Sequence, residues 1–485
     1  MQFPLIEYRR RGWLVVFALG VALAIAGGAV IALGSPVIAF AIVIGAVAGA
    51  VVLSNIDYGL YAVIAVAVLL PFGALPLNIG FNPTFLDLAL LALFGMWLAR
   101  GMLRQTGEFV ATPVGLAILV FLVLAVFSFI AGLAYAPLTQ DVLRHFAEVL
   151  ISIALFFVVV NVVRTRQALG RFVTALIVAG SISAAIGIAL YFIPQTWSIQ
   201  LLSALRVFKY PSGDGVLRFI EDDPANPMRA ISTSIDPNVL GGLLILVTAL
   251  TVPQIFASQP LLPRKMVVVM VVTMAVCMVL TFSRGAMLGL GLALVVIATV
   301  RYRPMIALLI LGAAVILLMP FTQDYVGHFV DAFALSDLAT QMRLGEYKDA
   351  LTLISRYPVF GVGFGGSPDV DTYLGVSNVY LLMAEEMGVV GVTVFLVTMG
   401  TFFYQATRAW FERVANDAFL APILLGVAGA LLGAMIGGMT DHYFFNLAFP
   451  HSVALFWMYV GLGMAAVRLG TRNDDQVFDN PCSPA

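Results

Sequence analysis

The chain has 485 residues, of which 61% are hydrophobic and 11% are charged, and its formal net charge is −1. No soluble globular protein has this composition, so the sequence predicts an all-α, polytopic integral membrane protein. The net charge by itself says nothing about partners, and we expect membrane lipids but no nucleic acid among them. The two cysteines, Cys277 in an apolar run and Cys482 in the tail, exclude a disulfide framework and a cysteine metal site.

Apolar runs long enough to span a membrane recur along the whole chain. The first run follows Arg9, Arg10 and Arg11, is too long for the apolar part of a signal peptide and precedes no clear cleavage site, so we expect a retained first span. The pattern predicts a bundle of about 12–14 transmembrane helices. The runs lie at 13–33, 36–54, 59–77, 85–99, 113–134, 145–163, 170–193, 238–257, 266–282, 285–300, 304–320, 378–406, 418–438 and 448–467.

Basic residues in the short loops give the orientation of these spans. If the N-terminus is cytoplasmic and the spans alternate, 16 of the 25 basic residues fall in short inner loops and nine fall outside. We therefore expect a multi-pass membrane protein whose two termini are both cytoplasmic. The inner clusters are Arg9/Arg10/Arg11, Arg100/Arg104, Arg164/Arg166/Arg171, Arg264/Lys265, Arg301/Arg303, Arg408/Arg413 and Arg468/Arg472.

Two long loops on the outer side divide the chain into regions. The first carries the irregular stretch Lys209–Gly215 and the acidic run Glu221–Asp223. The second is long enough to hold structure of its own, and long loops of this kind are often functional. The predicted regions are helices over 1–193, an outer loop over 194–236, helices over 237–320, an outer loop over 321–376, helices over 377–468 and a cytoplasmic tail over 469–485.

The second loop has the pattern of an amphipathic helix. Ser336 is its candidate N-cap, Pro358 and Gly361 end it, and Arg343 lies off its apolar stripe. The stripe is Leu344, Tyr347, Leu351 and Ile354. The glycine-rich run 361–366 lacks the strand–turn–helix context of a nucleotide-binding loop, so we expect its glycines to allow tight backbone packing or a turn.

Cations and polar groups gather where the outer loops meet the spans. Each of them alone is explained by a structural role, such as the helix caps expected at Asp236 and Asn238 or an arginine extending to the headgroups. Arg229, Arg284 and Arg343 together, without matching carboxylates inside the spans, require an anion. An outward-facing anion embedded in lipid is most simply a lipid phosphate or diphosphate.

Four stretches in the C-terminal half resemble the bacterial O-antigen ligase/polymerase superfamily of membrane enzymes. They are RAISTSIDPNVLG (229–241), LTFSRGAML (280–288), RLGEYKDALTLISRYPVFGVGFGG (343–366) and NVYLLMAEEMGVVG (378–391). The resemblance implies a metal-independent, inverting glycosyltransferase of the GT-C type without a cofactor. Such an enzyme of the bacterial inner (cytoplasmic) membrane takes glycan from undecaprenyl diphosphate on the periplasmic face. It passes the glycan to a sugar hydroxyl on a glycan or lipid-linked acceptor. It leaves open whether the reaction is a polymerisation or a ligation.

The chain departs from this family at Ser377, where the family has a histidine that deprotonates or orients the acceptor. His442 beside Asp441 is the replacement that we favour, since a neutral imidazole suits a general base, and Glu385 and Glu346 are alternatives. The predicted catalytic residues are His442, Arg284, Arg343 and Asp441, and the predicted substrate-binding residues are Arg229, Asn238, Ser283, Glu346, Asn378 and Tyr380.

A transporter or flippase of lipid-linked glycan, or a non-catalytic family member, is the rival hypothesis. Transporters carry ionisable residues near the middle of their spans, together with internal repeats. The predicted spans hold almost no carboxylate in their middles, and the charges gather at one face. This distribution favours chemistry at the outer surface over alternating access.

Overall fold

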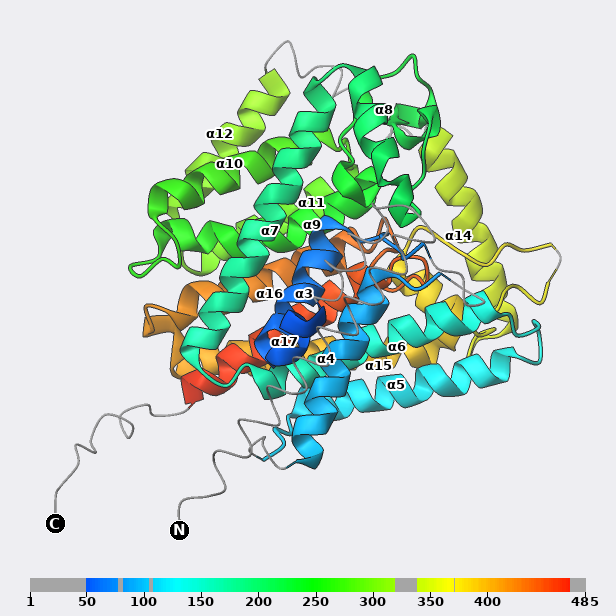
Figure 1. Cartoon of the computed structure of the whole chain (residues 1–485), viewed down its shortest axis with the longest axis horizontal. Coiled ribbons are helices and arrows are strands. Elements are labelled where there is room, and N and C mark those ends of the chain that lie inside the picture. The colour runs from blue at the N-terminus through cyan, green and yellow to red at the C-terminus, as the bar shows by residue number, and fades with distance from the viewer. Residues whose placement is uncertain (1–48, 77–81, 104–107, 319–337, 370, 472–485) are drawn as a thin grey trace, which may run out of the picture.

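The computed structural model describes residues 49–76, 82–103, 108–318, 338–369 and 371–471. Within these ranges the protein is an all-α bundle with one two-stranded hairpin, which confirms the predicted fold class (Figure 1). The hairpin pairs β1 (Arg218–Phe219) with β2 (Met228–Arg229). Two helices, α8 (Gln195–Ala204) and α14 (Leu338–Arg356), lie in the two long loops.

All twelve apolar runs expected between residues 59 and 467 form helices. The expected span at 13–33, and all but the end of the one at 36–54, lie outside the described residues. These helices are α3 (Ile56–Leu69), α4 (Phe85–Met102), α5 (Pro113–Gly132), α6 (Gln140–Val162), α7 (Arg166–Phe192), α9 (Pro237–Phe256), α10 (Arg264–Leu280), α11 (Arg284–Val300), α12 (Pro304–Leu318), α15 (Val379–Glu412), α16 (Leu420–Gly437) and α17 (Pro450–Thr471). In the described part of the chain, eight have the length and hydropathy of membrane spans, namely α4 to α7, α9 and α15 to α17.

Side-chain caps mark where several of these helices begin. Asp236 accepts hydrogen bonds from the amides of Asn238 and Val239, and Pro237 takes the first helical position, where no amide donor is needed. Thr84 and Asp87 form a reciprocal capping box at the start of α4. The expected capping role is therefore correct for Asp236, whereas Asn238 lies inside the first turn and its Oδ1 accepts from Arg229.

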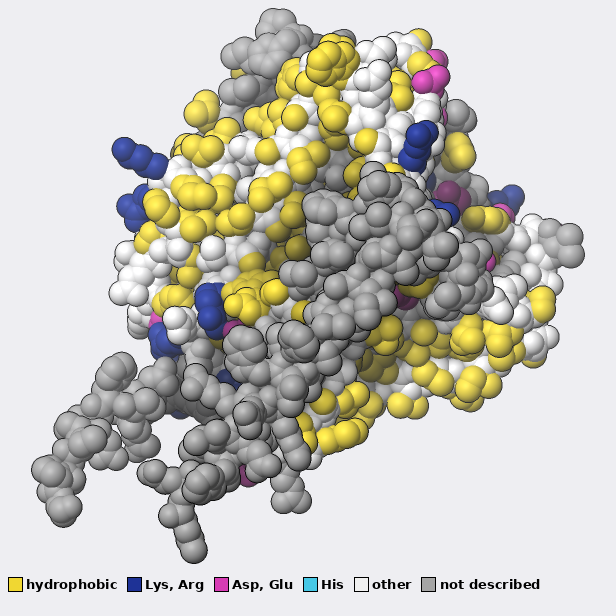
Figure 2. Space-filling model, viewed as in Figure 1, with side chains coloured by type: hydrophobic (Ala, Val, Ile, Leu, Met, Phe, Trp, Pro, Cys, Tyr) yellow, Lys and Arg dark blue, Asp and Glu magenta, His cyan; other side chains and the backbone are white. Residues whose placement is uncertain are grey.

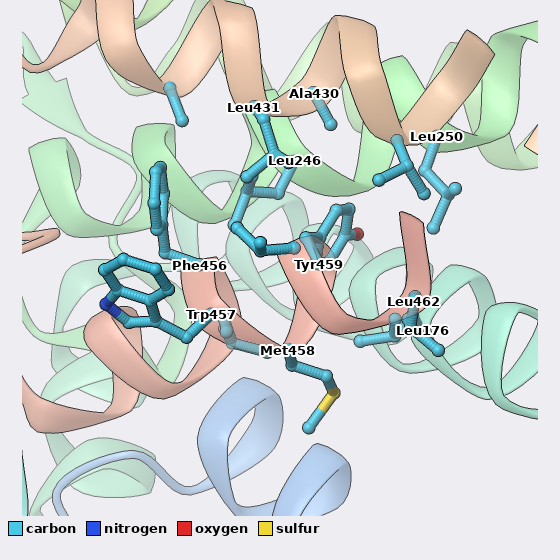
Figure 3. Close-up of a cluster of buried hydrophobic side chains, with 14 of the residues drawn as sticks. Leu176, Leu246, Leu250, Ala430, Leu431, Phe456, Trp457, Met458, Tyr459 and Leu462 are labelled. Carbon is cyan, nitrogen blue, oxygen red and sulfur yellow. The ribbon is translucent and has the colours of Figure 1, made fainter. Parts of the chain in front are cut away.

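Helix α17 lies at the centre of the bundle. Figure 3 shows Phe456, Tyr459 and Leu462 of α17 among side chains of α7, α9 and α16. Trp457 and Tyr459 are almost fully buried, although both belong to a membrane span. Helix α17 is thus surrounded by protein, whereas Figure 2 shows hydrophobic side chains on the outer surface of α5 and over α10 and α12.

Arginines of the predicted inner loops bind groups that belong to other predicted inner loops. Arg166, which begins α7, forms a 2.8 Å ion pair with Asp417 in the loop between α15 and α16. Arg468 near the end of α17 donates to the carbonyls of Val160 and Val163, where α6 ends. The ends of α6, α15 and α17 and the start of α7 therefore share one face, as the alternating arrangement predicts.

Cysteine labelling tests which face is outside. We expect Ser212→Cys and Lys348→Cys to react with an impermeant maleimide in intact cells or spheroplasts, because both positions lie in the long loops and are exposed. Arg303→Cys, in the short loop before α12, should react only after permeabilisation. The native Cys277 is buried and Cys482 is replaced by serine. Labelling of Lys348→Cys only after permeabilisation would overturn the orientation.

Helix α14 buries a different face from the one expected. Leu344 and Leu351 of the predicted apolar stripe are 47% and 59% exposed, whereas Ala350 and Leu353 are fully buried. The helix packs against α15 through this second face, and Tyr347 is partly buried beside it. The stripe prediction was wrong because Leu344 and Leu351 lie on the side of α14 that faces away from the bundle. Ser336, the predicted cap, lies outside the described residues.

The segment 358–363, which includes the start of the glycine-rich run 361–366, packs into a break in α15. Gly388 has φ +68° and ψ −177°, which interrupts the helical hydrogen bonds of α15. The segment 358–363 takes these bonds over: the amides of Val362 and Gly363 donate to the carbonyls of Glu385 and Glu386, and the amide of Val389 donates to the carbonyl of Pro358. Backbone groups freed inside a span must find such partners. The expectation of tight packing at these glycines is thus confirmed.

Candidate functional site

Five parts of the chain meet around a cavity of about 120 Å³ on the side of the two long loops. Its walls come from the β1–β2 hairpin, the first turns of α9 and α11, helix α14 and the loop between α16 and α17. The lining residues are Ile220, Glu221, Arg229, Asn238, Phe282, Ser283, Arg284, Gly285, Ala286, Arg343, Thr440 and Asp441. They include six of the ten residues that we predicted for the site, and all three arginines.

Arg229 is held by bonds to two other walls of the cavity. Its Nε donates to the carbonyl of Thr281 and its Nη2 to Oδ1 of Asn238, both at 2.8 Å. The amide of the next residue, Ala230, donates to the carbonyl of Leu280. The hairpin is therefore attached to the turn between α10 and α11, and Arg229 has a structural task besides lining the cavity.

The turn between α10 and α11 places the first residues of α11 at the cavity. Phe282 adopts a left-handed conformation, with φ +52°, and Arg284 is the first helical residue after Ser283. Asn238 lies in the first turn of α9, so two helix N-termini reach the same cavity. Asp236 already caps the amides of Asn238 and Val239 at α9. The N-terminus of α11 carries no side-chain cap, and its helix dipole attracts anions in addition to the charge of the guanidinium groups.

Two glycines allow the loop after α16 to approach these helices closely. A Cβ atom on Gly285 would lie 1.8 Å from Oγ1 of Thr440, and one on Gly242 would lie 2.2 Å from the buried ring of Tyr443. The loop from 438 to 449 is therefore pressed against the first turns of both α9 and α11. This contact brings Thr440 and Asp441 to the cavity.

Asp441 and Arg343 are the oppositely charged groups on the far walls. Burial raises the pKa of the Asp441 carboxyl above its ordinary value, and the charge of Asp236 raises it further. The charges of His442 and Arg343 lower this pKa but do not outweigh burial. Oδ1 of Asp441 accepts a 2.8 Å hydrogen bond from the backbone amide of His442, which orients the carboxylate.

The structure does not bring His442 to the cavity wall. Its ring lies near that of Phe449, with 6.0 Å between the centroids, and its buried Nδ1 has no hydrogen-bond partner among the described residues. The contact between Asp441 and His442 runs through the backbone amide. An arrangement in which Asp441 orients the imidazole is therefore not formed in this structure.

The remaining predicted residues bind protein groups beside the cavity. Oε2 of Glu346 accepts from the amide of Ser377, and Asn378 caps α15 while its Nδ2 donates to the carbonyl of Met439. The hydroxyl of Tyr380 donates to the carbonyl of Met435. These bonds join α14, the start of α15 and the end of α16, and so they hold the segments that carry Arg343 and Asp441.

Glu385, an alternative base, is 1% exposed and does not line the cavity. Sequence reasoning did not select Glu221 and Thr440, which do line it. Thr440 could have been found because it directly precedes Asp441. Nothing in the sequence alone brings Glu221 toward Arg284, since this depends on the path of the hairpin. Within the described ranges, no three His, Cys, Asp or Glu side chains are grouped as metal ligands.

Residues 269–396 match the family model of O-antigen ligase. The match runs from α10 into α15 and includes Ser283, Arg284 and Arg343 of the cavity. It supports the O-antigen ligase superfamily that the sequence motifs indicated. No curated protein matches the chain. The O-antigen ligase family implies a role in membrane glycan processing, and the cavity lies where the matched segment meets the first long loop and the α16–α17 loop.

Proposed function

We propose that the chain is a membrane glycosyltransferase that moves glycan from an undecaprenyl-diphosphate donor to a sugar hydroxyl at the periplasmic face of the inner membrane. The observation that carries this proposal is the cavity itself, which combines three guanidinium groups with the N-terminus of α11. Such a site suits a diphosphate in both charge and geometry. The O-antigen ligase family supports the same substrate class.

In the proposed reaction the acceptor oxygen attacks the anomeric carbon of the donor glycan. The bond from that carbon to the diphosphate oxygen breaks, its electron pair leaves with the diphosphate, and the acceptor proton passes to a base. Direct displacement inverts the anomeric centre. Arg229, Arg284 and Arg343 stabilise the charge that develops on the leaving diphosphate, and holding both substrates in line supplies much of the remaining rate.

Asp441 is the base that this geometry favours over His442. Its carboxylate lines the cavity, whereas the imidazole of His442 lies against Phe449. A raised pKa also makes Asp441 a better proton acceptor than an ordinary aspartate, because a stronger base removes the acceptor proton more readily. The proposed general base is therefore Asp441, one residue before His442, which the sequence suggested.

We expect Asp441→Asn to lower kcat by about 10²–10⁴-fold, the usual size of an acid–base contribution. Asparagine keeps an oxygen for the bond from the His442 amide, so folding should be unaffected. In the unsubstituted protein the base must be deprotonated, so kcat should fall as pH decreases through a pKa above the ordinary aspartate value, and Asp441→Asn should lack this step. His442→Ala is the matched control and should keep it. A large loss in His442→Ala with near-normal Asp441→Asn would assign the base to His442.

Reconstitution tests the function as a whole. Purified protein in liposomes is given lipid-linked glycan extracted from the source cells as donor, with the same glycan or lipopolysaccharide core as acceptor, all on one side of the membrane. A glycosyltransferase lengthens or transfers glycan under these conditions. A flippase instead changes the sidedness of the donor without a new glycosidic bond, and that result would reject the proposal.

A further inference from the structure

We infer that Glu221 binds the hydroxyl groups of the acceptor sugar and thereby positions the acceptor at the cavity, an inference that rests on the proposed function. Glu221 is a lining residue of the cavity and comes from the first long loop, outside the segment that matches the O-antigen ligase family. It is also exposed, so its carboxylate lies where a polar molecule can reach it from the aqueous side.

The backbone at Glu221 has a strained conformation of the kind found at binding and catalytic sites. Glu221 has φ +58° and Asp222 has φ +55°, a region that residues with a side chain seldom adopt, least of all in succession. Strain of this kind persists only where the surrounding structure enforces it, and it collects at binding and catalytic sites.

The hairpin supplies the bonds that enforce this conformation. The amide of Ile220 donates to the carbonyl of Pro227, and Nδ2 of Asn226 donates to the carbonyl of Ile220. The amide of Ala225 donates to Oδ1 of Asp223. The same hairpin carries Arg229, which is bonded to Thr281 and Asn238. Glu221 is therefore held relative to the anion-binding arginines.

Charge assigns Glu221 to the acceptor. A carboxylate repels the donor diphosphate, which the arginines attract, so Glu221 does not serve as a diphosphate ligand. An ionised carboxylate accepts hydrogen bonds at both oxygens, and adjacent sugar hydroxyls can donate to both. No hydrogen bond or ion pair within the described ranges engages the Glu221 carboxylate, which leaves both oxygens available to a ligand.

The test separates acceptor binding from the chemical step. In reconstituted protein, the donor is held at saturation while the concentration of core oligosaccharide or lipid-linked glycan is varied, and the reverse titration gives the KM for donor. Glu221→Gln should raise the acceptor KM by about tenfold or more, since hydrogen bonds to a charged group are the stronger ones. The donor KM and kcat should change by less than about twofold, and Glu221→Asp should recover part of the acceptor affinity.

Asp222→Asn is the matched control, because Asp222 is the neighbouring acidic residue with the same backbone conformation and does not line the cavity. Its acceptor KM should be unchanged. An unchanged acceptor KM in Glu221→Gln overturns the inference, as does an equal rise in both variants. Loss of kcat with unchanged acceptor KM would instead make Glu221 a base and also overturn it. If the unsubstituted protein transfers no glycan to either acceptor, the proposed function fails before Glu221 is tested.

Discussion

Arg343→Ala is expected to slow glycan transfer by about 10²–10³-fold, as when one preorganised contact to developing charge is removed. Arg343 extends from α14 to the cavity wall, and no hydrogen bond or ion pair to another described residue holds its guanidinium. The variant should therefore fold normally and lose only the interaction with substrate. Arg343→Lys should restore little activity, because a point charge does not reproduce a planar, two-pronged grip on phosphate.

Lys348→Ala is the matched control for Arg343→Ala, since Lys348 is an exposed cation on the same helix that does not line the cavity. The rate of transfer in reconstituted protein gives the effect, and the Tm in detergent reports on folding. Arg284→Ala should have a loss of similar size. Arg229→Ala should also lower the Tm, because it removes the bonds to Thr281 and Asn238. Near-normal transfer by Arg343→Ala would contradict its assignment to the site.

Gly388→Ala is expected to destabilise the protein by more than about 4 kcal/mol, so that it fails to accumulate in the membrane. A Cβ atom there would lie 2.1 Å from the carbonyl oxygen of Val359, which belongs to the backbone and cannot rotate away. The conformation, φ +68° and ψ −177°, is also one that only glycine adopts without strain. The substitution must expel the segment 358–363 or straighten α15, and either change leaves backbone groups of Glu385 and Glu386 without partners.

Gly400→Ala provides the comparison within the same helix. Nothing lies within 4 Å of a Cβ atom at Gly400, and its backbone is helical, so alanine should be neutral or stabilising by up to about 1 kcal/mol. Expression level and Tm in detergent measure both variants. A Gly388→Ala protein with the Tm of the unsubstituted chain would mean that the break in α15 is not required for folding.

The arginine cluster could be predicted because its members are defined by topology. Arg229, Arg284 and Arg343 lie far apart in sequence. Arg229 and Arg284 lie near outer ends of spans and Arg343 lies in an outer loop, so alternation of the spans places all three at one face. Hydropathy therefore limits the positions that such residues can take to a thin layer. Within that layer the sequence does not distinguish a ligand from an anchor. Asn378 and Tyr380 were predicted to bind substrate, and they hold α15 against the end of α16.

The sequence by itself determined the class of protein, the positions of the twelve apolar helices between residues 59 and 467, and the resemblance to the O-antigen ligase superfamily. Burial of apolar surface and obligatory backbone hydrogen bonding leave a chain of this composition few alternatives to a helical bundle. Only the tertiary structure decided which side chains around the arginines reach the cavity. His442 and Asp441 are neighbours in sequence, yet the imidazole of His442 lies near the ring of Phe449 while Asp441 lines the cavity. Glu221 reaches the same cavity through a left-handed backbone held by a hairpin. The directions of these side chains depend on loop dihedral angles and on hydrogen bonds between distant segments. Neither of these leaves a periodic pattern in the sequence.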